Sequence, residues 1–360
     1  MKIVHAIFSF ATGGAETMLV DIINHQCNKA SVSLIVVNNK VNKDLLKTID
    51  KSVAVFLLER KEGAKGQLLP SFFKIWKIIR RIEPDVIHCH DSNLFPFFTW
   101  WKRKTCLTVH NVQLSTSFLK NYEQVFAVSI AVQKDIKKRI GIEAKIIYNG
   151  IELAQYQVRN NHDFDPAHEP FKIIQISRLS PIQKGQHIAI QSIRLLKELH
   201  PDIWVQLYFV GDGDALAELQ NLVIQYNLQE RIIFVGQVDR EWVKIHLQDY
   251  HLLIQPSLYE GFGLTIIEGF AAGLPVIASD IDGPREIFDF LNAGLNVTAG
   301  DPNDLADKIY YLYTCYTSGD LLNYNYLIKN KTKMESFDIQ TTVSHYMEQY
   351  RNLILNTKTV

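Results

Sequence analysis

Long apolar runs are absent from this sequence of 360 residues, and cysteine is scarce. No uncharged apolar stretch approaches the ~20 residues that a membrane span needs, which argues against an integral membrane protein. The short apolar run at the N-terminus is followed by no small-residue cleavage site, so we interpret it as a first strand and not as a signal peptide. The four cysteines, Cys27, Cys89, Cys106 and Cys315, show no C-x-x-C spacing. We therefore expect reduced thiols and a cytoplasmic protein.

A complete glycine fingerprint for dinucleotides is also missing. Gly13 and Gly14 follow the first apolar segment, but no G-x-G-x-x-G stands at that turn. Gly211 and Gly213 make half of such a pattern, and Leu216 occupies the place of the third glycine. The sequence therefore disfavours a nicotinamide or flavin site.

The formal net charge of zero hides an asymmetry along the chain. Residues 1–155 carry 22 Lys and Arg against 13 Asp and Glu, a net charge of +9, so the remaining residues carry −9. A basic half beside an acidic half suggests that one of them faces an anionic partner.

Two segments of the basic half combine cations with large apolar side chains. Lys74–Ile82 has the pattern of a basic amphipathic helix, and Phe97–Lys104 interleaves aromatic residues with Lys and Arg. Tryptophan beside such cations suits a membrane interface, so we expect peripheral contact with an anionic membrane. The alternative is that the apolar stripe of Ile75–Ile82 packs on a sheet while its cations are solvated. Nucleic acid is not expected, because no recognisable nucleic-acid module accompanies the basic face.

Short apolar segments alternate with amphipathic helical patterns along the whole chain. Such alternation predicts parallel strands joined by crossover helices, here in two Rossmann-like domains that face one cleft. The predicted strands are Ile3–Phe10, Ser33–Val37, Ala54–Leu57, Val86–His88, Cys106–His110, Gln124–Val128, Ala144–Tyr148, Lys172–Ser177, Trp204–Val210, Ile232–Val235, Leu252–Gln255 and Val276–Ala278. Helices are predicted over Glu16–Gln26, Ser71–Ile82, Ile130–Ile140 and Asp338–Leu355.

Composition divides the chain at a polar segment that is poor in aliphatic residues. We assign residues 1–155 to the first domain, 156–170 to a linker, 171–335 to the second domain and 336–360 to a terminal helix. A monomer is expected.

The segment Tyr259–Ser279 is the most informative part of the sequence. It sets two carboxylates, Glu260 and Glu268, around a glycine-rich turn from which a helix is predicted to start near Gly263. Free backbone N–H groups and the positive dipole end of that helix, at Gly263 to Thr265, form a site for an anion such as phosphate. Phosphate between two acidic side chains is tolerable if each carboxylate accepts hydroxyl hydrogen bonds from one side of a diphosphate. A nucleotide-sugar has that layout of hydroxyl groups.

This arrangement resembles the E-x7-E motif of retaining glycosyltransferases that have the two-domain GT-B architecture, specifically their large fourth family. Further motifs of that family are matched in order over nearly the whole chain. They are Gly13-Gly14-Ala15-Glu16, Thr108-Val109-His110, Asn149-Gly150-Ile151, Ser177-Arg178-Leu179 with Lys184-Gly185, Gly211-Asp212-Gly213 and Val235-Gly236-Gln237. The resemblance implies that the first domain is the acceptor side, that the second binds the nucleotide-sugar, and that the terminal helix crosses back to the first domain.

The resemblance also implies a role for each matching residue. Arg178 and Lys184 would grip the donor's diphosphate, Glu268 the ribose hydroxyls and Glu260 the hydroxyls of the sugar. His110 would contact the sugar and stabilise charge. The catalytic residues expected on this basis are His110, Glu260, Arg178 and Lys184. The expected donor-binding residues are Gly13, Gly14, Arg178, Lys184, Phe262, Gly263, Leu264, Thr265 and Glu268.

The implied reaction transfers a sugar from a nucleotide-sugar, with UDP as the expected nucleotide, to a glycan or lipid-linked acceptor in surface polysaccharide or glycolipid synthesis. Retention by front-face attack is favoured, because no carboxylate is clearly placed as a nucleophile. The alternatives are a nucleotide-sugar 2-epimerase on the same scaffold and a non-catalytic nucleotide-sugar-binding protein.

No cofactor or metal is expected. His88-Cys89-His90 has no evident second pair of ligands, and Asp280-Ile281-Asp282 lacks the structural context of the D-x-D signature in metal-dependent glycosyltransferases. We interpret both segments as structural.

Overall fold

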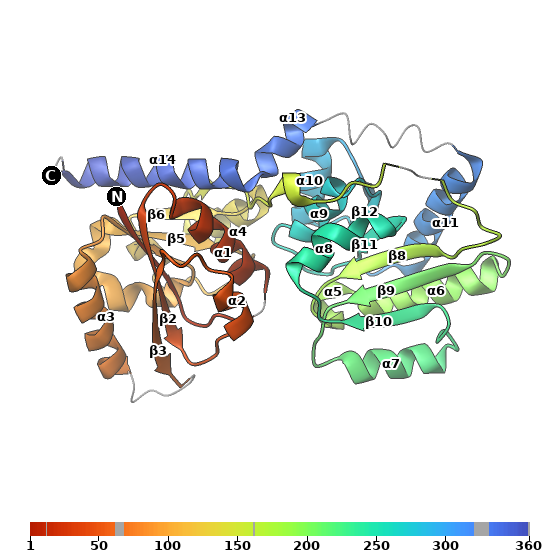
Figure 1. Cartoon of the computed structure of the whole chain (residues 1–360), viewed down its shortest axis with the longest axis horizontal. Coiled ribbons are helices and arrows are strands. Elements are labelled where there is room, and N and C mark those ends of the chain that lie inside the picture. The colour runs from red at the N-terminus through yellow and green to blue at the C-terminus, as the bar shows by residue number, and fades with distance from the viewer. Residues whose placement is uncertain (12, 62–67, 161–162, 320–330, 359–360) are drawn as a thin grey trace. The chain divides into compact units, whose positions relative to one another are not determined.

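Residues 1–11, 13–61, 68–160, 163–319 and 331–358 are described by the computed structural model of the chain, and they form two compact units (Figure 1). The first unit consists of Met1–Ile151 together with Ser336–Val360, and the second of Glu152–Glu335. None of the helices within the described ranges is long and apolar enough to cross a membrane.

The first unit is built on a seven-stranded parallel sheet in the order β3-β2-β1-β4-β5-β6-β7. Its strands are Lys2–Ile7 (β1), Ser31–Asn38 (β2), Ala54–Arg60 (β3), Val86–Cys89 (β4), Thr105–Val109 (β5), Gln124–Ala127 (β6) and Lys145–Ile146 (β7). The order runs outward from β1 toward one edge and from β4 toward the other. The carboxyl ends of β1 and β4 therefore mark the switch point, where open α/β sheets bind ligands.

The helices of the first unit bury apolar stripes against this sheet. They include α1 (Gly14–Gln26), α2 (Lys43–Lys47), α3 (Leu68–Ile82), α4 (Ile130–Ile140) and α14 (Ile339–Lys358), with the 3-10 segment η2 over Ser92–Lys104. In α1, Leu19 and Ile23 are i and i+4 on one face, and both pack with Leu34 and Val36 of β2 in a fully buried cluster. The helical period of α1 and the strand run of β2 thus meet in one apolar layer.

Helix α14 docks on the first unit through buried hydroxyl groups. Tyr346 and Tyr350 are 1% and 0% exposed. The Tyr350 hydroxyl lies 2.6 Å from His88 Nδ1, and the Tyr346 hydroxyl lies 2.9 Å from Thr108 Oγ1. Because a buried polar group without a partner is unfavourable, these hydrogen bonds fix where the helix lies along β4 and β5.

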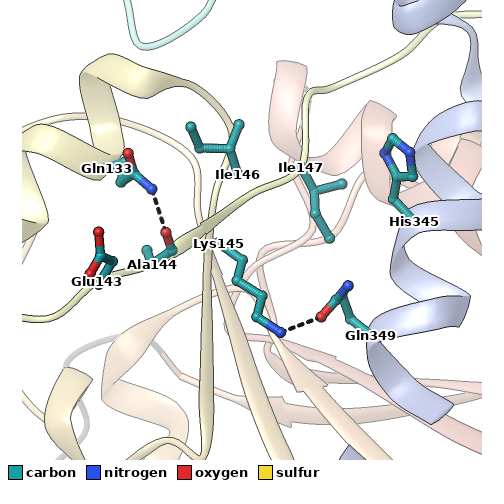
Figure 2. Close-up of a pocket in the computed structure, with 8 residues that line it drawn as sticks. All are labelled: Gln133, Glu143, Ala144, Lys145, Ile146, Ile147, His345 and Gln349. Carbon is teal, nitrogen blue, oxygen red and sulfur yellow. Dashed lines mark hydrogen bonds between the residues drawn. The ribbon is translucent and has the colours of Figure 1, made fainter. Parts of the chain in front are cut away.

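Polar contacts also hold α14 at the edge of the sheet. A surface depression of about 530 Å³ lies between α4, β7 and α14, and Figure 2 shows the residues that line it. At this depression Lys145 Nζ donates to Gln349 Oε1 at 2.6 Å, and Gln133 Nε2 of α4 donates to the Ala144 carbonyl at 2.7 Å. The two-residue strand β7 is thereby tied both to α4 and to the C-terminal helix.

The second unit is built on a six-stranded parallel sheet in the order β10-β9-β8-β11-β12-β13, with its switch point between β8 and β11. Its strands are Phe171–Ile176 (β8), Val205–Val210 (β9), Ile232–Gly236 (β10), Leu252–Gln255 (β11), Val276–Ser279 (β12) and Leu295–Val297 (β13). Its helices include α5 (Pro181–Lys184), α6 (Gln186–Leu199), α7 (Leu216–Gln225), α8 (Arg240–His246), α9 (Leu264–Ala271), α10 (Asp282–Leu291), α11 (Pro302–Ser318) and α13 (Lys331–Met334).

The predicted strands all lie on observed strands, and the α/β class with two parallel sheets is confirmed. The bounds differ where the chain leaves the sheet before its apolar run ends. The first strand stops at Ile7, and Phe10 forms only an isolated bridge with Val41, although its ring is fully buried. Strand β13 was not predicted.

We expect Tyr350→Phe to destabilise the first unit by about 1–3 kcal/mol, because it leaves His88 Nδ1 buried without its hydroxyl partner. Amide hydrogen exchange of the full chain, followed in peptides from β4 and α14, measures this loss. Tyr259→Phe is the matched control, since the Tyr259 side chain is 53% exposed. Equal protection in the two variants would contradict the role of the Tyr350 hydroxyl.

Candidate active site

The predicted phosphate-binding cations and the predicted carboxylates lie in the segments that follow the two central strands of the second sheet. Arg178 and Lys184 follow β8, and Glu260 and Gly263 follow β11. These strands are neighbours on either side of the switch point. Parallel strands end at the same edge, so the two loops meet there.

Lys184 and Glu260 form a direct ion pair across these loops. Lys184 Nζ lies 2.6 Å from Glu260 Oε2, and the two side chains are 17% and 16% exposed. Each charge therefore already has its counter-charge in a largely dehydrated position. A ligand with phosphate on one side and hydroxyl groups on the other could take over both partners.

Gly185 allows the loop after β8 to approach β11. Its φ is +69°, and a Cβ added there would lie 1.9 Å from the Pro256 carbonyl oxygen. The contact is reinforced by Leu258 N, which donates to the Gln183 carbonyl at 2.8 Å, and by the buried Gln175, which donates to the Lys184 carbonyl at 2.7 Å. Backbone contacts thus fix where the Lys184 side chain starts.

Arg178 differs from Lys184 in its surroundings. Its side chain is exposed, and its guanidinium has no hydrogen bond or ion pair with any of the described residues. Its backbone is held, because Gln186 Nε2 donates to the Arg178 carbonyl at 2.8 Å. The structure therefore offers one paired and one unpaired cation at this edge of the sheet.

Helix α9 begins at this edge without a side-chain cap. Its N-cap residue, Gly263, has φ +108°, and no side chain caps the first turn, which contains Leu264 and Thr265. Backbone N–H groups at such an end attract anions. The Phe262 ring is buried at 3% exposure, so that residue can offer a ligand only its backbone.

Glu268 lies on α9 beyond this N-terminus and is held by a tyrosine. The Tyr156 hydroxyl donates to Glu268 Oε1 at 3.0 Å, and Tyr156 itself is 6% exposed. The neighbouring Gln157 N donates to the Lys244 carbonyl and Arg159 N to the Ala272 carbonyl, both at 2.9 Å. The segment after Ile151 therefore belongs to the second unit and helps to orient one of its predicted ligand-binding carboxylates.

Gly13, Gly14 and His110 lie at the carboxyl edge of the first sheet. Gly13 is the N-cap of α1, with extended backbone at φ −169° and no side-chain cap, and α1 starts at Gly14. His110 directly follows β5, and its Nδ1 atom is buried without a hydrogen-bond partner.

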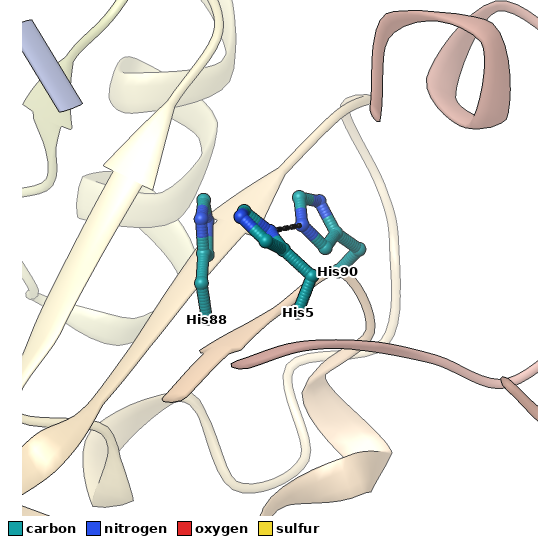
Figure 3. A group of neighbouring side chains, drawn as sticks. All are labelled: His5, His88 and His90. Carbon is teal, nitrogen blue, oxygen red and sulfur yellow. Dashed lines mark hydrogen bonds between the residues drawn. The ribbon is translucent and has the colours of Figure 1, made fainter. Parts of the chain in front are cut away.

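A line of hydrogen bonds connects His110 with two further histidines. His110 Nε2 lies 3.2 Å from His90 Nδ1, and His90 Nε2 lies 3.1 Å from His5 Nδ1 (Figure 3). His5 Nε2 lies 2.8 Å from the Oε1 atom of the buried Gln26 on α1. His88 lies beside this line, directly opposite His5 in the β1/β4 register. His5 could not be recognised from the sequence, because a single histidine in an apolar strand has no spacing signal.

Two family models match the chain, and together they cover almost all of it. The model for glycosyl transferases group 1 matches residues 158–334, and the model for glycosyltransferase family 4 matches residues 12–155. The chain is a glycosyltransferase of the GT-B, family-four type. The predicted site residues from Gly13 to Glu268 all lie within the matched ranges.

Similar proteins support this assignment over most of the chain. An uncharacterized glycosyltransferase of Methanocaldococcus jannaschii is 27% identical over an alignment of 303 residues, which covers 74% of this chain and 71% of that protein. A phosphatidyl-myo-inositol mannosyltransferase of Mycobacterium leprae is 26% identical over 75% of this chain and 74% of its own. The chain spans about one third to three quarters of the length of the curated relatives that it matches.

The solved structures share the fold of this glycosyltransferase. Anabaena HepE in complex with UDP and glucose has a TM-score of 0.78, with 24% identity over 97% of this chain and 99% of that chain. At this identity the match shows the architecture alone.

Burial keeps four histidines of the glycosyltransferase neutral, namely His5, His88, His90 and His110. It lowers the pKa of His110 to about 4, and it lowers the pKa of His5 to about 4 against the opposing hydrogen bond with Gln26. The pKa values of His88 and His90 are also well below the ordinary range, mainly through burial and further through the neighbouring histidines. Each ring near pH 7 therefore has one N–H donor and one acceptor nitrogen, and His110 is a weak base.

Three of these histidines are close enough together to be compared with a metal site. His5, His88 and His90 offer nitrogen atoms that lie within 4.8 Å of one another. Both His88 nitrogens are already hydrogen-bonded, however, at 2.6 Å to Tyr350 and at 2.7 Å to Thr108. A metal ion would have to displace these bonds, so the donor set fits a hydrogen-bond network better. The expected absence of a metal stays a prediction.

We expect Gly185→Ala to destabilise the second unit more than Gly319→Ala does. Both glycines end a helix with positive φ, +69° and +75°, so each substitution carries about 1–2 kcal/mol of left-handed backbone strain. Only Gly185 also meets the backbone at Pro256, whereas none of the described residues lies within 4 Å of a Cβ at Gly319. Hydrogen exchange in peptides from β11 and α5 measures the difference. Equal effects would show that the close approach at Pro256 contributes nothing.

Proposed function

We propose that this glycosyltransferase transfers a sugar from UDP-sugar to a lipid-linked or glycan acceptor, with retention at the anomeric carbon and without a metal ion. The observation that carries the proposal is the Lys184–Glu260 pair, 2.6 Å apart beside the uncapped N-terminus of α9. A cation, a carboxylate and free N–H groups at one switch point match a donor that has a diphosphate between two sets of hydroxyl groups.

The charges of the site suit a departing diphosphate. Arg178 and Lys184 supply two cations, and the first turn of α9 supplies partial positive charge from Gly263 to Thr265. Together they stabilise the negative charge that grows on the diphosphate as its bond to the sugar breaks. A divalent cation is then not needed for this purpose.

The two carboxylates divide the remaining contacts of the donor. Glu268, oriented by Tyr156, accepts hydrogen bonds from the ribose hydroxyls. Glu260 leaves Lys184 to the diphosphate and accepts hydroxyl groups of the sugar. In these contacts both Glu260 and Glu268 accept hydrogen bonds from hydroxyl groups, so neither carboxylate is placed as a nucleophile. The acceptor therefore attacks from the front face.

Two neighbours support the choice of donor and acceptor. HepE was solved with UDP and glucose, which favours a UDP-sugar donor for this chain. The relative from Mycobacterium leprae is named for transfer to phosphatidyl-myo-inositol, which favours a lipid acceptor. The 2-epimerase and the non-catalytic alternatives have no observation in their favour.

The basic surface of the first unit suits such a lipid acceptor. Ile75 and Ile79 of α3 are fully buried, so part of the apolar stripe does pack on the unit. Leu69, Phe73 and Trp100 are instead 72%, 65% and 69% exposed. Exposed cations surround them, namely Lys74, Lys77, Arg80, Arg81, Lys102 and Arg103. Apolar side chains interleaved with cations are what an anionic membrane interface binds.

Glu268→Ala is expected to weaken UDP binding, whereas Glu260→Ala is expected to bind UDP no more weakly than the wild type while turnover falls at least tenfold. The reason is that UDP carries the ribose but not the sugar that Glu260 is proposed to hold. Calorimetry with UDP and a UDP-release assay over a panel of UDP-sugars measure the two effects, and NMR of the product shows whether the anomeric configuration is retained. Glu198→Ala, at an exposed surface pair on α6, is the control. Wild-type transfer in both site variants would overturn the proposed function.

Trp100→Ala is expected to reduce binding to vesicles that contain an anionic phospholipid, and added salt is expected to reduce binding of the wild type. The loss follows from removing an exposed indole among cations, and the salt effect from screening of Lys and Arg. Co-sedimentation with vesicles of mixed phosphatidylglycerol and phosphatidylcholine measures both. Trp204→Ala is the matched control, because Trp204 is 46% exposed in the second unit. Equal binding by the two variants would argue against this surface.

A further inference from the structure

The hydrogen bonds from Gln26 to His110 form one continuous line with a direction. Its three links are 2.8, 3.1 and 3.2 Å long, and they join Gln26 to His5, His5 to His90 and His90 to His110. Every ring in the line uses both of its nitrogens except His110, whose Nδ1 ends the line buried and unpartnered. His5 lies in β1, and His90 and His110 directly follow β4 and β5, so the line crosses the switch point of the first sheet.

A line of neutral imidazoles can be arranged in only two ways. Each neutral ring has one N–H and one bare nitrogen, so the direction of one link sets the direction of all the others. With the Gln26 carbonyl oxygen toward His5, His5 must donate from Nε2, His90 must donate to His5, and His110 must donate to His90. His110 Nδ1 is then a bare lone pair. The opposite orientation of the Gln26 amide would place a proton on that atom.

The surroundings of Gln26 favour the first arrangement. Burial raises the pKa of Tyr350 well above its ordinary value, and the Gln26 side chain opposes this rise. The Gln26 Oε1 atom itself lies 2.8 Å from His5 Nε2, so the amide oxygen faces this ring as in the first arrangement. The amide nitrogen makes no hydrogen bond of ordinary geometry with the described residues.

We infer that His90, His5 and Gln26 are positioning residues that fix the tautomer of His110, so that its Nδ1 accepts a hydrogen bond from a hydroxyl of the bound sugar. The inference rests on the proposed function for the identity of that hydroxyl. It follows from the unpartnered lone pair, which is buried where open sheets bind ligands and lacks only a donor.

The far end of the line also limits what His110 can do. A proton taken up at Nδ1 could move along the rings only as far as His5, because an amide oxygen does not hold a proton at neutral pH. The line therefore has no exit for a proton. His110 acts as a hydrogen-bond acceptor for the sugar and not as the general base of the reaction.

Nitrogen-15 NMR of the full chain labelled with [15N]histidine tests the tautomer directly, without any sugar nucleotide. At pH 7 we expect His110 to be protonated at Nε2 and bare at Nδ1. In His5→Phe, which keeps a ring but removes both nitrogens, we expect a mixture of the two His110 tautomers. A proton on Nδ1 in the wild type, or an unchanged tautomer in His5→Phe, would overturn the inference.

The matched control is His88→Phe, which removes a buried histidine that faces His5 in the register but lies outside the line. We expect it to disturb stability at least as much and to leave the His110 tautomer unchanged. A mixture of tautomers in both variants would show a general structural effect and would count against the inference.

Calorimetry with UDP and with UDP-glucose tests the sugar contact. In His5→Phe we expect an unchanged affinity for UDP and an affinity for UDP-glucose about tenfold lower, the effect of one neutral hydrogen bond. Unchanged affinity for UDP-glucose together with an altered tautomer would contradict the inferred hydrogen bond between a sugar hydroxyl and His110 Nδ1. Failure of the wild type to bind either probe would count against the proposed function, while the NMR result would still decide the tautomer.

Discussion

Each sheet of this protein depends on one constraint, the reversal of strand order between two neighbouring parallel strands. Connections that leave β8 and β11 toward opposite edges do not cover the carboxyl ends of these strands, and the same holds for β1 and β4. Loops from residues far apart in the sequence must therefore meet there, as Lys184 and Glu260 do. The polar side chains of both units gather at these two places because the topology leaves no apolar layer above them.

Polar groups removed from water are stabilised differently at the two switch points. In the second unit, Lys184 and Glu260 balance each other and Glu268 accepts a hydrogen bond from Tyr156, while the exposed Arg178 remains unpaired among the described residues. In the first unit burial removes the charge, and His5 and His110 stay neutral with pKa values of about 4. A neutral ring then needs a donor on one side and an acceptor on the other. This requirement produces a directional line of bonds, whereas ion pairs have no such direction.

More of the fold than of the site geometry could be predicted from the sequence. Apolar runs bounded by turn residues located every strand except β13, which has three residues and is too short to show a period. The start of α9 at Gly263 followed from the glycine-rich turn and from the apolar segment after it. The ends of strands were less predictable, since Phe10 is as apolar as β1 but lies outside the sheet.

Contacts between distant residues could not be obtained from one sequence. Lys184 was expected at the phosphate and Glu260 at sugar hydroxyls, and nothing in their spacing of 76 residues indicated that they bind each other. His5 is a comparable case, because its meaning comes from its neighbours in β4 and from Gln26 on α1. Pairing of this kind depends on strand order and register, which the sequence specifies only through the whole fold.

The Lys184–Glu260 pair also bears on how a site can be prepared for a ligand that carries both phosphate and hydroxyl groups. Two unpaired, dehydrated charges would be unfavourable in the empty protein, and they would bend the loops apart or draw in water. Paired, they hold the loops at the spacing that the backbone contact at Gly185 already requires. A ligand that offers Lys184 a phosphate and Glu260 a hydroxyl exchanges one set of partners for another with little rearrangement. A ligand with only one of these groups would leave the other charge uncompensated, so the pair itself favours ligands that carry both.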